Sequence, residues 1–546
     1  GILPHHTRWA PFFQSLRYVV LDEIHSYRGV FGSHVANVLR RLKRICAFYG
    51  SEPQFLCSSA TIANPLELAE RLTEERFALV DREEDGSPHG PKHFLFYNPP
   101  IVDAKLGIRR SAVSDSRLMA QRFLLNGVQT IVFARARLTT ELLLTYLRDT
   151  ARGEGLSEER VQGYRGGYLP SERRDIERGL RERKVLGVVA TNALELGINI
   201  GHLDACVMTG YPGTIASTWQ QAGRAGRRAE TSAAVLVAGA SPLDQYIVRH
   251  PAYFFGRSPE QALLNPDNLV IAVNHIRCAA FELPFAQGEG FGRVPHTQEV
   301  LDFLHEEGTL QQSRDRWHWA DEVYPAEVVG LRTAEMDNFV VVDTSREGIV
   351  IGVVDRQGVP LLIHEGAIYL HAGESYRVER LDWDGRRADV TPVEVGYYTQ
   401  ASVSVSVQVT GVEAEASGPT TLKACGQVLI RSRATSFKKV RLYTHETLGW
   451  GEISPDSIPE QEMETTGYWF SILPEATTRL EEEGLLSLER GDRGPNWAQQ
   501  RNRARARDGY VCRHCAAPER PDRAHDVHHV QPFRTYGYER GKNDHY

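Results

Sequence analysis

Long apolar runs are missing from this sequence, which excludes one broad class of protein. No segment approaches the roughly 18 consecutive apolar residues that a membrane-spanning helix needs. Cysteine is scarce as well, with 7 in 546 residues. Four of these lie within apolar stretches: Cys46, Cys57, Cys206 and Cys278. Only Cys512 and Cys515 are spaced as a pair, so the sequence predicts a cytoplasmic protein of a reducing compartment with no membrane partner.

A strong positive charge is also absent. The formal net charge is −7, whereas a protein that adheres to nucleic acid over its whole surface favours a basic surface. Any contact with nucleic acid must therefore be local. Three basic stretches are candidates for touching phosphate, although each is more typical of a solvated helix or strand face: 173–184, 431–441 and 501–507.

The third absence is a P-loop for nucleotide phosphates. The pattern GxxxxGK[ST] occurs nowhere, and the nearest string, GYERGKN at 537–543, has the wrong spacing and lacks the hydroxyl residue. The sequence begins with Gly directly before a predicted strand, and it stops at GKNDHY without a closing element. We therefore expect a fragment cut at both ends, with its phosphate cradle outside it.

The order of apolar patterns predicts several domains. At roughly 150 residues per domain, 546 residues allow three or four. Strand and helix patterns alternate up to about residue 260, which is typical of parallel α/β sheets. A looser stretch in the eighties and nineties divides them into two α/β domains, predicted at 1–100 and 101–260.

The register of the pattern changes beyond residue 260. Residues 261–325 indicate helices followed by a short strand, which is compatible with a winged-helix unit. Short alternating runs in 330–475 predict a small antiparallel barrel or sandwich. A charged helical linker at 476–505 and a segment with cysteines and histidines at 506–546 complete the predicted order.

Paired carboxylates follow the first predicted strand. Asp22 and Glu23 come directly after YVVL at 18–21, so we expect them at the carboxyl end of a parallel strand, where open α/β sheets bind ligands. Hydrolysis of ATP needs one carboxylate to hold Mg²⁺ and a second group to activate water. The sequence thus predicts Asp22 as the metal ligand and Glu23 as the water activator. The alternative is an acidic turn that caps the next helix.

Small polar residues follow the next predicted strand. Ser59 and Thr61 come after residues 54–58, so their hydroxyls are expected beside Asp22 and Glu23 on the same sheet edge. They would relay the state of the nucleotide. The alternative is a plain N-cap for the helix that begins at 65, a position that suits Thr61 or the nearby asparagine.

Gln220, Arg224 and Arg227 form a second constellation. Their spacings of four and three predict one face of a helix. Small residues between the arginines allow close approach to a phosphate-bearing surface, where an arginine finger stabilises the transferring phosphoryl group. The alternative, an exposed basic helix, is disfavoured because arginines interleaved with glycines make a poor helix.

Two loops at predicted strand ends complete the candidate site. GYRGGY at 163–168 and ATNALELGIN at 190–199 offer backbone amides and small polar groups that could clasp a sugar-phosphate backbone. The residues assigned to the site from these loops are Arg165, Gly166, Thr191, Gly197 and Asn199. Taken singly, both loops are equally typical of turns.

Together, these segments resemble the motifs of superfamily 2 helicases. Four of them occur in the order of that family: DEIH at 22–25 resembles the DExH box, SAT at 59–61 motif III, 190–199 motif V, and QQAGRAGR at 220–227 motif VI. The wider run, from GILPHHTRW at 1–9 to HEGAIYLH at 364–371, resembles the bacterial mitomycin repair factor subfamily, which is related to the eukaryotic RecQ4-like repair helicases.

The resemblance implies an α/β fold with RecA-like helicase domains, the first of them truncated. It implies ATP and Mg²⁺ as cofactors, single-stranded or partly duplex DNA as partner, and 3′ to 5′ translocation in DNA repair. The residues placed around the nucleotide are Asp22, Glu23, His25, Gly197, Asn199, Gln220, Arg224 and Arg227. Those assigned to coupling hydrolysis with DNA are Ser59, Thr61, Arg165, Gly166 and Thr191.

Two departures from the family pattern have consequences. The motifs that precede the DExH box, motifs I and Ia, are absent, so the chain by itself is expected neither to bind ATP tightly nor to unwind DNA. Asn199 stands where related helicases often have Asp, which puts the ribose or DNA contact of that position in doubt.

The last segment carries a further set of metal-ligand types. Cys512 and Cys515 at CxxC spacing are half of a tetrahedral Zn²⁺ site. His528 and His529 resemble the HNH endonuclease motif, in which the first binds a divalent metal and the second is the general base. Alternatively, the histidines complete a zinc knuckle. Two other functions therefore stay open beside the helicase: a helicase-coupled HNH endonuclease and a non-catalytic DNA-binding scaffold.

Overall fold

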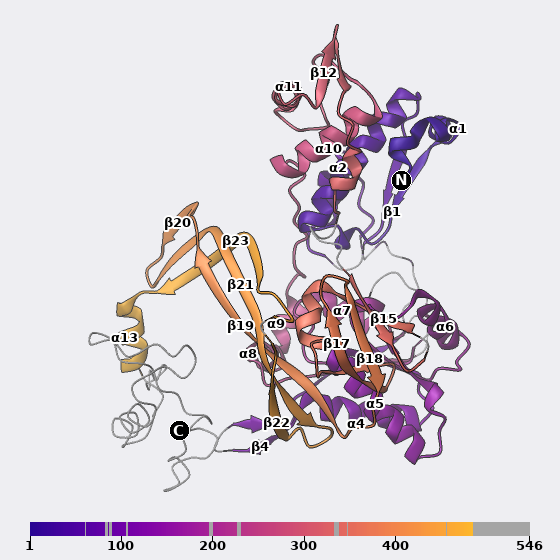
Figure 1. Cartoon of the computed structure of the whole chain (residues 1–546), viewed down its shortest axis with the longest axis vertical. Helices are drawn as coiled ribbons and strands as arrows, with labels where there is room; N and C mark the ends of the chain where they lie inside the picture. Colours follow the sequence, from indigo (N-terminus) through magenta and orange to yellow (C-terminus); the bar gives the residue numbers. More distant parts are fainter. Residues whose placement is uncertain are drawn as a thin grey trace. The chain divides into compact units, whose positions relative to one another are not determined.

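The structure is a computed structural model, drawn as a cartoon in Figure 1. It describes residues 1–59, 62–81, 84, 86, 90–104, 107–195, 200–201, 203–226, 231–331, 338–346, 348–454 and 456–483. Backbone contacts divide the chain into two units: Gly1–Ser404 with Arg433–Glu460, and Val405–Ser432 with the residues from Gln461 on. No helix in the described ranges has both the length and the hydropathy that a membrane crossing requires.

The first unit begins with a small α/β layer. Its elements are η1 (Leu3–Trp9), α1 (Ala10–Ser15), β1 (Tyr18–Leu21), α2 (Gly29–Phe48), β2 (Gln54–Cys57) and α3 (Pro65–Thr73). The two strands are parallel, with Leu21 opposite Cys57. Their buried core includes Leu21, Leu39, Phe55, Leu68 and Leu72. The predicted order of strand, helix, strand and helix is confirmed, and both strands end at the same sheet edge.

A six-stranded parallel sheet follows, in the order β3-β10-β9-β6-β8-β7. Its strands are β3 (Lys92–Tyr97), β6 (Thr130–Ala134), β7 (Val161–Tyr164), β8 (Gly187–Ala190), β9 (Ala205–Thr209) and β10 (Ser232–Val237). Its helices are α4 (Ala112–Leu125), α5 (Arg137–Gly153), α6 (Pro170–Arg181), α7 (Ile215–Ala222), α8 (Pro242–Arg249) and α9 (Pro251–Gly256). Residues of β6 alternate between two buried cores, Ile131 and Phe133 in one and Val132 and Ala134 in the other, so helices cover both faces.

Two of these strands were not predicted. β3 is an edge strand in the stretch that the sequence pattern left irregular, and it pairs with β10, Lys92 opposite Ser232. β7 occupies the start of the glycine-containing loop GYRGGY and pairs with β8, Tyr164 opposite Ala190. β3 pairs with residues far along the chain, and β7 pairs with β8 across α6, so the local pattern alone predicts neither strand.

Two helices and three short strands form the predicted winged-helix unit. They are α10 (Leu269–Glu282), β11 (Phe285–Ala286), α11 (Thr297–Glu306), β12 (Leu310–Ser313) and β13 (Arg316–Trp319), with the strands in the order β11-β13-β12. Figure 1 shows α10 beside α2, and the two helices are in contact. Arg41 Nε on α2 donates to Glu282 Oε2 on α10 (3.0 Å), and the guanidinium of Arg44 lies 3.8 Å from the centre of the Phe285 ring.

A buried histidine pair in this contact makes the stability of the protein depend on pH. His275 Nε2 lies 3.0 Å from His34 Nδ1, and burial together with the nearby charge of Arg41 lowers the pKa of His275 to about 3. Below pH 6.5, His275 becomes protonated in the unfolded chain but stays neutral in the folded protein. The free energy of unfolding therefore falls as the pH drops from about 6.5 towards 3. Between pH 6.5 and 5 this loss amounts to about 2 kcal/mol.

The variant His275→Gln isolates this contribution because glutamine does not titrate. Thermal unfolding followed from pH 7 to pH 5 should show a steeper loss for the wild type than for the variant, by about 2 kcal/mol. Parallel curves would show that His275 protonates as easily in the folded as in the unfolded state. Titration of the histidines that do not contact His275 is common to both proteins and cancels in the difference.

The remainder of the first unit is rich in β-structure. One five-stranded sheet contains β14 (Asn338–Asp343), β15 (Ile349–Asp355), β16 (Ile368–His371), β17 (Glu374–Asp382) and β18 (Arg387–Pro392), in the order β15-β14-β18-β17-β16. The prediction of an antiparallel sheet is wrong at one position, because β14 and β18 pair in parallel. The chain between them supplies the crossover that a parallel pair needs. β22 (Thr447–Glu452) pairs with the end of β21 (Thr421–Arg441) nearby in the sequence.

The second unit contains antiparallel strand pairs. Over Thr421–Ser432, β21 pairs with β23 (Gln461–Ile472), with Thr421 opposite Ile472. β20 (Ala414–Ser417) pairs with β21 as well. α13 (Pro474–Glu482) follows, at the start of the predicted charged helical linker.

Candidate active site

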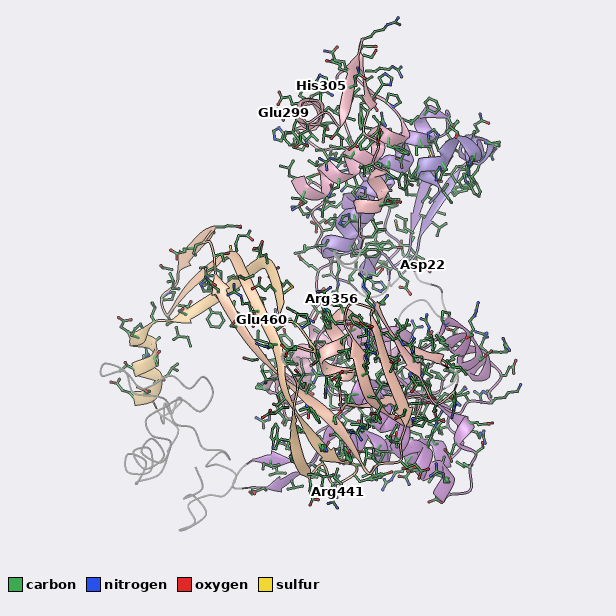
Figure 2. The ribbon with its side chains drawn as sticks, in the orientation of Figure 1. Asp22, Glu299, His305, Arg356, Arg441 and Glu460 are labelled. Carbon is green, nitrogen blue, oxygen red and sulfur yellow. The ribbon has the colours of Figure 1, made fainter. Side chains whose placement is uncertain are left out.

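Asp22 and Glu23 lie at the carboxyl end of β1, where Figure 2 labels Asp22. The amide N–H of Glu23 donates to Asp22 Oδ1 (2.9 Å), and the Asp22 side chain is exposed. Glu23 has a left-handed backbone with a φ of 54°, which is unfavourable for a residue with a Cβ and concentrates at functional sites. Carboxylate oxygens are the ligands that Mg²⁺ prefers, so this pair fits the predicted metal chemistry.

His25 follows in the same turn. Its Nδ1 lies 3.4 Å from Glu23 Oε2, and the residue is buried. Burial lowers the pKa of His25, and the carboxylate of Glu23 opposes that effect only in part. The imidazole is therefore neutral at pH 7, so it can hydrogen-bond to Glu23 without neutralising the carboxylate charge.

Ser58 is a site residue that the sequence analysis missed. It follows β2 directly, and its hydroxyl donates to Asp22 Oδ1. The signal was available, because the pairing of Leu21 with Cys57 sets the next residues, Asp22 and Ser58, side by side. Ser59, the predicted coupling residue, is exposed one position further along. Ala60 and Thr61 lie outside the described residues.

The predicted helix face of Gln220, Arg224 and Arg227 is wrong in its geometry. α7 ends at Ala222, and Arg224 lies in the turn that follows. Glycines on both sides explain the end of the helix, since Gly226 has a φ of +79° and glycine is a poor helix former. Arg224 is 8% exposed, and Arg227 lies outside the described residues.

Lys92 on β3 holds the end of this helix. Its Nζ donates to the carbonyl of Ala222 (2.9 Å), just before the turn that carries Arg224. Burial lowers the pKa of Lys92. A cation at a helix C-terminus is stabilised by the helix dipole. Local patterns in the sequence cannot predict this contact, because it joins residues 130 positions apart.

A cleft of about 220 Å³ lies between the DEIH turn and α7. The residues that line it are His25, Ser26, Arg28, Ile62, Asn192, Glu195, Thr214, Ala216, Ser217, Gln220, Glu260 and Ala262. The structure thus brings together two of the motifs that the sequence singled out. Of the predicted nucleotide residues that the structure describes, Asp22, Glu23 and Arg224 stand outside this lining.

Glu195 is a second residue that the sequence analysis did not single out. It follows the short helix η4 (Asn192–Leu194) and accepts hydrogen bonds from two side chains of α7, the hydroxyl of Ser217 (2.5 Å) and Nε2 of Gln221 (2.9 Å). Thr191, predicted to contact DNA, caps η4 through its hydroxyl oxygen, which accepts from the amide of Ala193 (3.4 Å). Gly197 and Asn199 lie outside the described residues.

The contact with a sugar-phosphate backbone that we predicted for Arg165 is wrong. The side chain of Arg165 is 1% exposed, and its Nε donates to Glu141 Oε1 (2.6 Å). Its Nη2 donates to the carbonyl of Leu370 on β16 (3.2 Å). The loop packs against another strand instead of facing solvent, and its Gly166 forms a bridge with Tyr168. A guanidinium buried with these partners cannot reach DNA.

The predicted metal residues of the last segment cannot be placed. Cys512, Cys515, His528 and His529 all lie outside the described residues. Within the described ranges, no group of three or more histidine, cysteine, aspartate or glutamate side chains is arranged to hold a metal ion.

Three family models match the chain. They fall, in turn, on the first α/β layer, the six-stranded sheet and the winged-helix unit. Residues 1–69 match the DEAD/DEAH box helicase family, residues 116–229 the helicase conserved C-terminal domain, and residues 264–334 the winged helix domain of the ATP-dependent helicase HRQ1. These matches support a helicase of superfamily 2. The family predicted from the DEIH, SAT and QQAGRAGR segments is confirmed, and so is the winged-helix unit.

Relatives of the chain include bacterial and yeast proteins. It is 52% identical over 491 residues to the uncharacterized ATP-dependent helicase YprA of Bacillus subtilis, which covers 90% of this chain and 64% of YprA. It is 38% identical over 416 residues to the ATP-dependent helicase HRQ1 of Saccharomyces cerevisiae, covering 73% of this chain and 38% of HRQ1. The chain thus spans about two fifths to just under two thirds of the length of these relatives.

Solved structures show the same fold. The crystal structure of the DUF1998 helicase MrfA bound to DNA is 51% identical, with a TM-score of 0.81, covering 88% of this chain and 64% of that one. MrfA bound to DNA and AMPPNP is 51% identical as well, with a TM-score of 0.78 over 85% of this chain and 62% of that one. These matches support the resemblance to the mitomycin repair factor group and the RecA-like fold.

Proposed function

We propose that the protein is an ATP-dependent DNA helicase that acts in genome maintenance and moves 3′ to 5′ along single-stranded DNA. One observation carries the proposal: a single cleft is lined by His25 of the DEIH turn and by Gln220 of α7. A motor needs a nucleotide held by one α/β layer and sensed by the other, and these two segments come from different layers.

The carboxylates after β1 have distinct roles in the proposed reaction. Asp22, which accepts hydrogen bonds from the Ser58 hydroxyl and the amide of Glu23, would hold Mg²⁺. Glu23 orients the attacking water and takes up its proton, with the neutral ring of His25 beside it. Bound Mg²⁺ would supply positive charge that offsets the charge developing on the phosphates.

Arg224 is proposed to stabilise the same charge from the second layer. Lys92 and Glu195 fix the helix that precedes it, through Ala222 and through Ser217. Because a guanidinium at the transferring phosphoryl group acts only when the layers are closed, hydrolysis becomes linked to their movement. Relatives bound to DNA and AMPPNP support DNA and ATP as the partners.

The direction of movement is tested with partial duplexes. The full-length product of the natural reading frame should unwind a duplex with a 3′ single-stranded tail in the presence of ATP, and unwind one with a 5′ tail at least tenfold more slowly. A preference for the 5′ tail would contradict the polarity alone. Hydrolysis of ATP without unwinding of either substrate would contradict the helicase activity.

A further inference from the structure

Glu260 belongs to the stretch of chain that joins α9 of the second α/β layer to α10 of the winged-helix unit. None of the helicase motifs identified in the sequence covers this stretch. Its half-buried carboxylate accepts two backbone hydrogen bonds from the start of α7. The amide of Ile215 donates to Oε1 (2.7 Å), and the amide of Ala216 donates to Oε2 (3.0 Å). Glu260 also lines the cleft with His25 and Gln220.

These two bonds complete the cap of α7. The first amides of a helix have no carbonyl partner within the helix. The hydroxyl oxygen of Thr214 accepts from the amide of Ser217 (3.0 Å), and the Thr214 carbonyl accepts from the amide of Thr218 (3.1 Å). Glu260 takes the two amides that remain, although it is 45 residues from Ile215 in the chain. Its negative charge is also favourable at this end of the helix dipole.

α7 therefore has charged partners of opposite sign at its two ends. Glu260 binds the amides of its first turn, and Lys92 binds the carbonyl of its last residue, Ala222. Gln220 lies between these two contacts, and Arg224 follows directly after the second. The position of both predicted site residues thus depends on how this short helix is held.

The segment that carries Glu260 is also bonded to the first α/β layer. The Glu260 carbonyl accepts from the amide of Ala63 (3.3 Å). Asn64 and Ala262 exchange two bonds: the Ala262 amide donates to Asn64 Oδ1 (2.9 Å), and Asn64 Nδ2 donates to the Ala262 carbonyl (3.2 Å). Asn64 ends the stretch that follows β2, so the residues beyond the SAT segment are tied to the Glu260 segment.

The same segment continues along α2 into the winged-helix unit. The amide of Gly29 donates to the carbonyl of Leu263 (2.6 Å), and Asn37 Nδ2 donates to the carbonyl of Pro266 (2.8 Å). α10 begins two residues after Asp267, which is paired with Arg40 (2.6 Å). One short stretch of chain therefore contacts α7, the first α/β layer and the winged-helix unit.

We propose that Glu260 is a positioning residue that transmits movement of the first α/β layer and the winged-helix unit to α7, and so sets the place of Gln220 and Arg224 at the cleft. This inference rests on the proposed ATP-driven activity. According to this inference, the segment that carries Glu260 helps to link the binding of DNA to the hydrolysis of ATP. Glu260 does not touch the reacting atoms, so it acts only through α7.

The test compares ATP hydrolysis by the full-length protein and its Glu260→Ala variant, with and without single-stranded DNA. The variant leaves two helix amides without their acceptor, and we expect the DNA-stimulated kcat to fall about tenfold while the KM for ATP stays within twofold. Glu260→Gln keeps one acceptor oxygen and should recover kcat to within about threefold of the wild type. Glu299→Ala is the matched control, because the Glu299 side chain is 72% exposed.

Three outcomes would overturn the inference. The first is a DNA-stimulated kcat of Glu260→Ala within twofold of the wild type. The second is an equal loss of kcat and of ATP affinity with a lowered melting temperature, which would show a merely structural role. The third is a Glu260→Gln variant as impaired as Glu260→Ala. A wild type that does not hydrolyse ATP would instead contradict the proposed function, so the two failures are distinguishable.

Discussion

Replacing Glu23 with glutamine in the full-length protein should lower the kcat for ATP hydrolysis at least a hundredfold. Glutamine has the size of glutamate but cannot accept the proton of the attacking water, and general bases contribute about a hundredfold to ten-thousandfold. The left-handed turn at Glu23 and the contact with His25 hold the side chain at the sheet edge. Since binding does not use the base, affinities for ATP and DNA should stay within about threefold. Steady-state turnover and nucleotide titration measure the two quantities.

Glu52→Gln is the matched control for this variant. Glu52 is exposed near the start of β2, at the opposite end of the same two strands. Its variant should hydrolyse ATP at the wild-type rate. A Glu23→Gln protein that retains more than a tenth of the wild-type kcat would show that another group activates the water.

Arg224→Ala is the second variant with a large expected effect. A guanidinium that offsets charge on the transferring phosphoryl group is worth roughly a thousandfold or more in kcat, and the loss should appear in kcat with little change in the KM for ATP. Arg224→Lys keeps the charge without the planar fork of donors, so it should be intermediate. Single-turnover hydrolysis at saturating ATP isolates this step from product release.

The buried state of Arg224 makes this experiment informative. At 8% exposure and outside the lining of the cleft, the guanidinium must move towards the nucleotide to act. Arg249→Ala, an exposed arginine near the end of α8, controls for loss of positive charge. A full rate in Arg224→Ala would assign Arg224 to packing of the turn and move the role to another residue.

The order of elements could be predicted because it depends on local pattern. The apolar runs of β1, β2 and β6 and the helices between them were found from the sequence, and the structure confirms them. The edge strand β3 was missed because its pairing with β10 is made by residues far along the chain. The parallel pairing of β14 with β18 was missed for the same reason, since topology is not a property of either strand alone.

The part of the candidate site that lies at strand ends could be predicted from the sequence. Asp22 and the serines after β2 follow from parallel pairing, although Ser58, whose hydroxyl donates to Asp22, was not singled out from the sequence. Glu260 acts through contacts with distant residues that spacing does not reveal. The burial of Arg165 could not be predicted either, because it depends on an ion pair with Glu141 on α5. The end of α7 before Arg224 was predictable, since two glycines follow Ala222 within four residues.

The central claim is that the cleft between the DEIH turn and α7 hydrolyses ATP in response to DNA. The most direct test is steady-state ATP hydrolysis by the full-length protein, titrated with single-stranded DNA. The account predicts a kcat that rises at least tenfold with DNA and reaches a plateau. A protein that hydrolyses no ATP, or hydrolyses it at the same rate without DNA, would contradict it.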